Sequence, residues 1–210
     1  NFVNCIKLNT MKNLLFTFAL LISVISFGQT AEEYFNSGMD KVKAYDYYGA
    51  ISDYNKVIEL DPNYTDAYVD RGTTKSFLND YSGAMADYNK AIELNPNLAE
   101  IYNNRGALKI SIYDYYGAIS DFNKAIELLP NFVTAYRNRG DSKNKLKQYD
   151  DAIIDYNKAI ELDPNYTSAY INRSISKEKL GDLIGACADA KFAANLGDNG
   201  SENWVASNCN

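Results

Sequence analysis

A pattern that returns every 34 residues constrains this chain more than any other feature. It is clearest from Thr65 to Leu98, and with Thr65 as position 1 the best-kept columns lie at positions 4, 8 and 23. These columns hold Tyr34, Tyr68, Tyr102, Tyr136 and Tyr170; Gly38, Gly72, Gly106, Gly140 and Ser174; and Asp53, Asp87, Asp121, Asp155 and Asp189. The chain therefore contains five copies of one unit, at 31–64, 65–98, 99–132, 133–166 and 167–200. The last copy is degraded at its end and is followed by residues 201–210.

The spacing inside each unit predicts two helices. Positions 4, 8 and 11 lie on one face of a first helix, and positions 17, 20, 24 and 27 on one face of a second, because an α-helix repeats every 3.6 residues. Small residues at positions 8, 20 and 27 let the helices approach closely, and aromatic residues fill the space beside them. Four aspartates should cap the second helices and four prolines should end them. They are Asp46, Asp80, Asp114 and Asp182, and Pro62, Pro96, Pro130 and Pro164.

A 34-residue unit with an aromatic at 4, Gly at 8, Ala at 20, an aromatic at 24, Ala at 27 and Pro at 32 resembles the tetratricopeptide repeat. The resemblance covers Ala31 to about Gly200 and implies an all-α, right-handed solenoid of five helix-turn-helix units. After it, we expect Ser201 to about Ser207 to form a capping helix that lays Trp204 and Val205 on the open end. The chain departs from the family by carrying Tyr at position 4, mostly Arg at position 7 and Lys at position 11. We expect each Lys to pack its stem and extend its amine to solvent.

The arginines at position 7 are present in units two to five, whereas unit one has Ser37. Because a first unit has no predecessor, one hypothesis pairs each Asp at position 23 with the Arg of the next unit. The pairs would be Asp53 with Arg71, Asp87 with Arg105, Asp121 with Arg139, and Asp155 with Arg173. The alternative is that the arginines only solvate the helix surface.

The stretch Met11–Gln29 resembles a secretory signal, with Lys12 before an apolar run from Leu14 to Ile25 and a small-x-small cleavage site at residues 26–28. A membrane anchor is the alternative, but the run is shorter than the roughly 20 residues that a spanning helix needs. We therefore expect a secreted or periplasmic protein that begins near Gln29 and keeps no stable membrane span. Residues 1–10 are expected to be upstream translation from a misassigned start.

Composition argues against several functions. The chain has no histidine, which excludes Ser/His and Cys/His catalysis and histidine-based zinc sites. Its carboxylates recur by unit instead of gathering in one place, so no catalytic, metal or cofactor site is predicted. Cleavage would change 21 basic against 27 acidic residues to 19 against 27, and this acidic balance predicts no nucleic-acid binding.

In the tetratricopeptide family, the first helices line a concave groove through positions 2, 5, 6, 9, 12 and 13. Here position 6 forms a ladder of amides with one carboxylate that is suited to an extended peptide backbone, and we place Phe35, Asn103 and Arg137 beside it. The ladder is Asn36, Asp70, Asn104, Asn138 and Asn172. Alternatively, these amides satisfy neighbouring helices or water. The residues with which one subfamily grips a C-terminal carboxylate are absent, so we expect no chaperone-tail binding of that type.

We therefore predict a non-enzymatic scaffold that binds a protein or peptide partner in its groove. The alternative is an envelope component that self-associates by stacking its end units, so a homo-oligomer is possible. Export would also favour a disulfide between Cys187 and Cys209, 22 residues apart. The alternative is that Cys187 is a small buried hydrophobic residue and Cys209 part of a frayed terminus.

Overall fold

The computed structural model describes residues 29–209, which form eleven α-helices and, within that range, no strand. The predicted signal segment lies outside these residues. The first helices of the five units are α2 (Ala31–Lys43), α4 (Thr65–Phe77), α6 (Ala99–Ser111), α8 (Val133–Lys145) and α10 (Thr167–Lys179). The second helices are α3 (Tyr47–Leu60), α5 (Tyr81–Leu94), α7 (Tyr115–Leu128), α9 (Tyr149–Leu162) and α11 (Leu183–Asn195), and α12 (Asn199–Asn208) follows.

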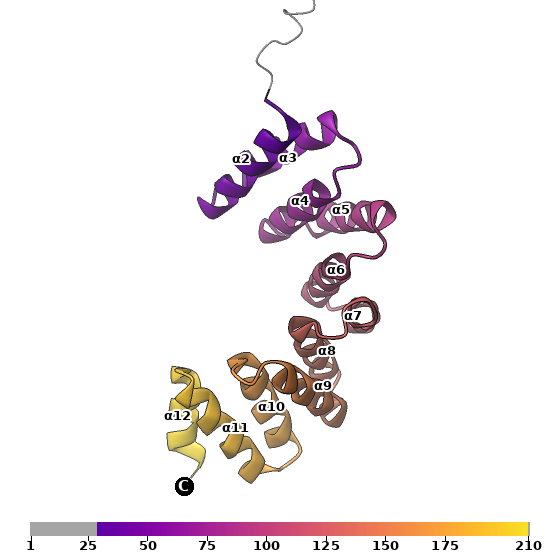
Figure 1. Ribbon diagram of the computed structural model, residues 1–210. Helices are drawn as coiled ribbons and strands as arrows, with labels where there is room; N and C mark the ends of the chain where they lie inside the picture. The colour runs from indigo at the N-terminus through magenta and orange to yellow at the C-terminus, as the bar shows by residue number, and fades with distance from the viewer. Residues whose placement is uncertain (1–28, 210) are drawn as a thin grey trace, which may run out of the picture.

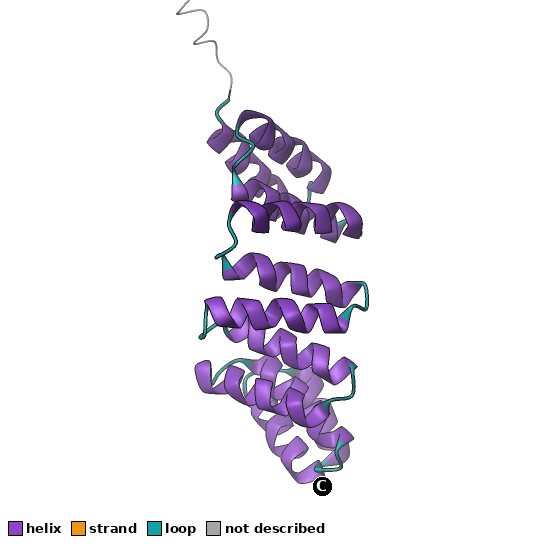
Figure 2. Cartoon of the chain, turned by 90° about the vertical axis from the view of Figure 1, so that its right-hand side faces the viewer, coloured by secondary structure: helices purple, strands orange, loops and turns teal. Residues whose placement is uncertain are grey.

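The helices form a curved solenoid. Each first helix packs against the second helix of its own unit and also contacts the first helix of the next unit. In Figure 1, α4 and α6 lie on the inner side of the curve, with α5 and α7 on its outer side. Figure 2, turned by a quarter, shows successive helices stacked along the chain with short connections. The predicted all-α solenoid of five units with a terminal cap is confirmed.

The core is built from alanines and, in each of the first four units, one aromatic ring at position 24. The alanines of columns 20 and 27 are fully buried, and so is Val57, which takes one of these positions. They lie beside rings that are at most 3% exposed, namely Tyr54, Tyr88, Phe122 and Tyr156. The glycine at position 8 makes room for this ring: a Cβ on Gly106 would lie 2.7 Å from Phe122 Cε1. Unit five has Ala190 instead of the ring, and there Ser174 replaces the glycine and donates to the Ala186 carbonyl.

We expect Gly106→Leu to destabilise the protein by about 1 to 3 kcal/mol, because its side chain would overlap the buried Phe122 ring. The better helix propensity of Leu offsets only about 1 kcal/mol of that cost. Urea denaturation followed by circular dichroism measures the difference. Gly106→Leu combined with Phe122→Ala should recover part of the loss, and a single variant as stable as wild type would contradict this packing.

The predicted helix caps are present. Asp46, Asp80, Asp114 and Asp182 each accept a hydrogen bond from the backbone N–H of the glycine three residues later. A Cβ on these glycines would lie 2.1 to 2.2 Å from the capping carboxylate, so the Asp and Gly occur together. Unit four lacks both residues of this pair. Gln148 stands in place of the capping Asp and makes no side-chain cap, and Asp151 stands in place of the Gly three residues later.

The arginines and aspartates pair within units and not between them, so the predicted pairing between units is wrong. In unit three, Arg105 donates to both carboxylate oxygens of Asp121, at 2.9 and 2.7 Å. Lys109 adds a second cation at 2.8 Å, so the expectation that these lysines extend to solvent is also wrong. Units two, four and five repeat this triad, as Arg71–Asp87–Lys75, Arg139–Asp155–Lys143 and Arg173–Asp189–Lys177.

The same arginines also connect neighbouring units, through the asparagine at position 25. Arg105 Nη1 donates to Asn89 of the preceding unit at 2.8 Å, and Arg71, Arg139 and Arg173 do likewise. Unit one has no preceding asparagine, and its Ser37 donates directly to Asp53. Unit five has no following arginine, and Lys191 takes its position 25. Ser37 therefore does mark a missing neighbour, but the missing partner is Asn, not Asp.

Tyrosine at position 4 is explained by a second contact between units. The hydroxyls of Tyr68, Tyr102, Tyr136 and Tyr170 donate to the carbonyls of the prolines that end the preceding units, at 3.0 to 3.2 Å. Each ring also makes a cation–π contact with the arginine of its own unit, whose guanidinium carbon lies 5.4 to 5.7 Å from the ring centre. Tyr at position 4 and Arg at position 7 thus act as a matched pair in units two to five.

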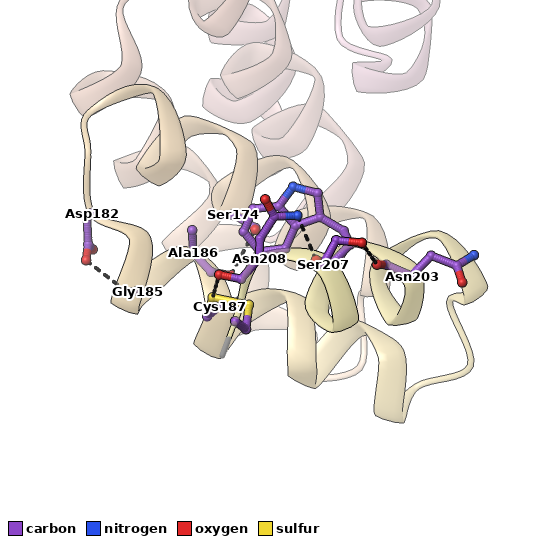
Figure 3. Close-up of a disulfide and its surroundings, with 10 residues drawn as sticks. Ser174, Asp182, Gly185, Ala186, Cys187, Asn203, Ser207 and Asn208 are labelled. Atoms are coloured by element: carbon purple, nitrogen blue, oxygen red, sulfur yellow. Dashed lines mark hydrogen bonds between the residues drawn. A yellow bond between two sulfur atoms is a disulfide. The ribbon is translucent and has the colours of Figure 1, made fainter.

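Helix α12 closes the last unit. It begins at Asn199, two residues before the predicted start, after Asp198 caps it by accepting from the Ser201 N–H. Trp204 and Val205 are half-buried, and Trp204 lies near Ser174 and Ala190, where unit five has lost its ring. Cys187 of α11 is bonded to Cys209, with the two Cα atoms 5.6 Å apart (Figure 3). The cap is therefore attached to the solenoid at both of its ends.

Candidate functional site

A cavity of about 600 Å³ lies on the inner face between three successive first helices. Helix α8 supplies most of its wall, α6 and α10 supply the two sides, and every lining residue comes from a first helix. The lining residues are Ala107, Ile110, Arg137, Asn138, Asp141, Asn144, Lys145, Asn172 and Ile175. Amides and charges from α8 thus share the cavity with apolar side chains from its neighbours. Such a surface suits an extended segment with both polar and apolar groups.

Asp141 organises the polar wall of this cavity. Its carboxylate accepts hydrogen bonds from Arg137 Nη1 at 2.8 Å, from the Tyr156 hydroxyl at 2.9 Å and from Asn172 Nδ2 at 2.7 Å. Burial, and then the Asp141 charge, raises the pKa of Tyr156, so this hydroxyl stays protonated and donates. Among residues 29–209, Arg137 Nη2 and Lys145 Nζ donate to no other side chain. Lys145 therefore remains available to an anionic group of a ligand, whereas Arg137 is already paired with Asp141 and offers only its Nη2 donor.

The predicted amide ladder is divided into separate environments. Asn138 and Asn172 line the large cavity with Arg137, but Asn138 also donates to Asn103 at 3.0 Å and Asn172 donates to Asp141. Asn103 contacts Asn104 in turn, at 3.4 Å. The alternative that the amides satisfy neighbouring helices therefore holds for part of the ladder. Asn36 is exposed on α2, far along the chain from this cluster.

Asp70 belongs to a second, smaller cavity, of about 240 Å³, between α2 and α4. Its lining is Met39, Val42, Lys43, Tyr54, Asp70, Thr73 and Thr74. Burial, and then the charge of Asp66, raises the pKa of Asp70 from 3.8 to about 6. Phe35 takes part in packing nearby, with its ring 5.8 Å from that of Tyr54 and 5.1 Å from that of Tyr64.

We expect Asp70→Asn to stabilise the free protein at pH 7 by about 1 kcal/mol. Between pH 4 and 6 the folded state binds more protons at Asp70 than the unfolded state does, so this carboxyl's contribution to stability falls as the pH rises through 6. Its oxygens reach the cavity solvent, which keeps the gain below the full value of the shift. Urea titrations at pH 4 and 7 test this. The gain should vanish at pH 4, and an equal gain at both would contradict the titration of Asp70.

The sequence did not identify all of the cavity residues. Asp141, Asn144, Lys145, Ile110 and Ile175 occupy positions 9, 12 and 13, which the family resemblance places in the groove, but only positions 5 and 6 supplied the predicted set. The available signal was Asp141, the one charged residue at position 9, four residues after Arg137. That spacing places the two side chains on one face of a helix.

The chain matches known tetratricopeptide repeats in sequence at two places. Residues 133–166 match the tetratricopeptide repeat family, and residues 78–109 match a TPR repeat family. No curated protein matches the chain. Among residues 29–209, none of the helices has the length and apolar character needed to cross a bilayer.

Solved structures share the fold over most of the chain. The crystal structure of MamA is 28% identical with a TM-score of 0.69, over 76% of this chain and 93% of that one. YrrB, described as a TPR protein with an unusual peptide-binding site, is 19% identical with a TM-score of 0.67, over 84% and 92%. PilF of Pseudomonas aeruginosa is 20% identical with a TM-score of 0.75, over 80% and 77%.

The comparisons agree with the repeat columns and with the helix pairs. The match at residues 133–166 coincides with unit four, and the match at residues 78–109 spans the second helix of unit two and most of the first helix of unit three. The same columns continue in register through the other units. The fold of the described residues is shared with solved members over most of their length. This chain is a tetratricopeptide repeat protein.

Proposed function

We propose that this protein is a non-enzymatic scaffold that binds an extended peptide segment of a partner on its inner face. The observation that carries the proposal is the cavity of about 600 Å³, where three consecutive first helices present amides, the Lys145 ammonium, the Nη2 donor of Arg137 and apolar side chains. Asn and Arg side chains can bond the peptide backbone and an acidic group, while Ile110 and Ile175 contact apolar side chains. The acidic end of the segment would lie beside Arg137 and Lys145.

We propose further that the protein is exported to the periplasm or the cell exterior. The signal-like stretch 11–29 and the bond between Cys187 and Cys209 support this location, because disulfides persist in oxidising compartments. The two kinds of feature are independent, since one lies before the solenoid and the other at its far end.

Self-association by stacking of end units is the alternative, and both ends are poorly suited to it. Helix α12 covers the open face of unit five. Neighbouring units are joined by a hydrogen bond from the arginine at position 7 to the asparagine at position 25 of the preceding unit. Unit one has Ser37 in place of that arginine, and unit five has Lys191 in place of that asparagine. A stacked copy would therefore find neither half of the bridge that joins neighbouring units inside the chain.

Cross-linking pull-down from the source organism's envelope tests the scaffold proposal. The double variant Ala107→Arg, Ile175→Arg fills the cavity from both sides, and Ser120→Arg adds one exposed arginine on the outer helix α7 as a control. A partner captured by wild type and by Ser120→Arg, but lost with the double variant, is the expected result. Equal capture by all three proteins would show that binding does not use the inner face.

A further inference from the structure

Asp70 is the exception in the ladder at position 6, where the other four units have Asn. Within residues 29–209, no side chain donates a hydrogen bond to its carboxylate and no cation pairs with it. Lys43, the cation that lines the same cavity, is paired with Asp40 at 2.8 Å instead. The cavity around Asp70 thus combines the side chains of Met39 and Val42 with one carboxylate that lacks a partner.

We propose that this cavity receives the side chain of a lysine or arginine from the partner segment, with its stem along Met39 and Val42 and its cation at Asp70. The proposal rests on the proposed function and adds the chemistry of one contact to it. An apolar wall with a charge at one end matches a long side chain that is apolar along its stem and charged at its tip. The inner face would then hold a basic side chain near units one and two, and an acidic group near Arg137 in unit four.

A metal ion fits this cavity less well than an organic cation. A divalent ion needs about six oxygen ligands, and the cavity offers one carboxylate. Of the hydroxyls in the lining, that of Thr74 donates to the Asp70 carbonyl and that of Thr73 donates to the Val69 carbonyl, and the phenol of Tyr54 is a weak ligand for such an ion. A single ammonium or guanidinium group needs only the charge-assisted contact that Asp70 provides.

Binding should depend on pH through Asp70. The ionisable groups that face it are Asp66 on the same helix, Lys43 on α2, Tyr54 on α3, Tyr64 before α4 and Tyr88 on α5. The tyrosines Tyr54, Tyr64 and Tyr88 have raised pKa values, chiefly because of burial, so they stay neutral across the acidic range. A bound cation favours the ionised carboxylate, so binding should strengthen as the pH rises from 4.5 to 7.5.

The direct test uses n-butylammonium as a mimic of the lysine side chain, with the Asp70 carboxyl carbon followed by NMR. If the probe prefers the ionised carboxylate tenfold, saturation should lower the pKa of Asp70 by about one unit, with shifts at the Met39 and Val42 methyl groups. The uncharged analogue 1-butanol should leave the pKa in place. An unchanged pKa in saturating butylammonium, or equal effects of both probes, would overturn the proposal.

Selection of random displayed peptides separates this proposal from the proposed function. Wild-type protein should enrich peptides with Lys or Arg at one fixed position, and Asp70→Asn should bind them about tenfold more weakly. Asp66→Asn removes the same charge one turn away and should change affinity by less than twofold. Enriched peptides without a fixed basic position would overturn the cation pocket and leave the groove proposal standing. If no peptide binds while butylammonium shifts the pKa, the cavity binds a cation, but the groove proposal fails and so does the assignment of that cation to a partner segment.

Discussion

Replacing Asp155 by alanine should cost about 3 kcal/mol of unfolding free energy. The Asp155 side chain is 1% exposed and pairs with two cations, Arg139 and Lys143, the latter at 2.8 Å. Removing it leaves two charges without their partner, and breaking a buried ion pair from one side typically costs about 3 to 5 kcal/mol. The lower value applies because the arginine and lysine side chains are 19% and 20% exposed and can recover some hydration.

Unit one supplies a control for this prediction. Asp53 holds the same position, but its partners are Ser37 and Lys41, and Lys41 is 36% exposed. Asp53→Ala should therefore cost only about 1 kcal/mol. Urea denaturation of both variants, followed by circular dichroism at equal protein concentration, gives the comparison. Equal losses of unfolding free energy in the two variants would show that burial of the ion pairs does not determine how much stability is lost.

The sequence predicted the elements of the fold because they depend on short spacings. Helix pairs, aspartate caps and the glycine contact at Gly106 all follow from residues that lie within one or two helical turns, or from one column that repeats. The ion pairs did not follow in the same way. Asp121 lies 16 residues after Arg105 and 18 residues before Arg139, and the repeat period allows either partner. Only the packing of the second helix against its own first helix decides between them.

The candidate site was less predictable than the fold. The positions of Arg137 and Asn138 within the repeat unit place them on the inner face. These positions do not show that Asn138 donates a hydrogen bond to Asn103, 35 residues earlier, instead of to a ligand. The chain does contain a partial guide to such contacts. Tyr156 donates to Asp141 and the Tyr88 hydroxyl bonds that of Thr73, whereas unit three has Phe122, without a hydroxyl, together with Ala107 at position 9. In these three units, the residues at positions 9 and 24 thus vary together, which indicates a contact that no single column reveals.

Removing the bond between Cys187 and Cys209 should cost about 3 kcal/mol, because the bond closes a loop of 22 residues in the unfolded chain. Helix α12 should be affected first, since a short terminal helix with half-buried Trp204 and Val205 buries little apolar surface by itself. Cys209→Ser should therefore speed amide exchange in α12, shift Trp204 fluorescence to longer wavelength and lower the urea midpoint.

Reduced wild-type protein is the matched control for this variant, because it loses the bond without a change of sequence. Reduction should produce the same shifts as Cys209→Ser and should have no effect on the variant. Mass spectrometry of unreduced, alkylated protein purified from the source organism provides the independent check, and two labelled thiols would contradict both the bond and the argument for export that rests on it. Since α12 covers the apolar surface that unit five exposes after losing its ring, opening the cap should also increase concentration-dependent light scattering.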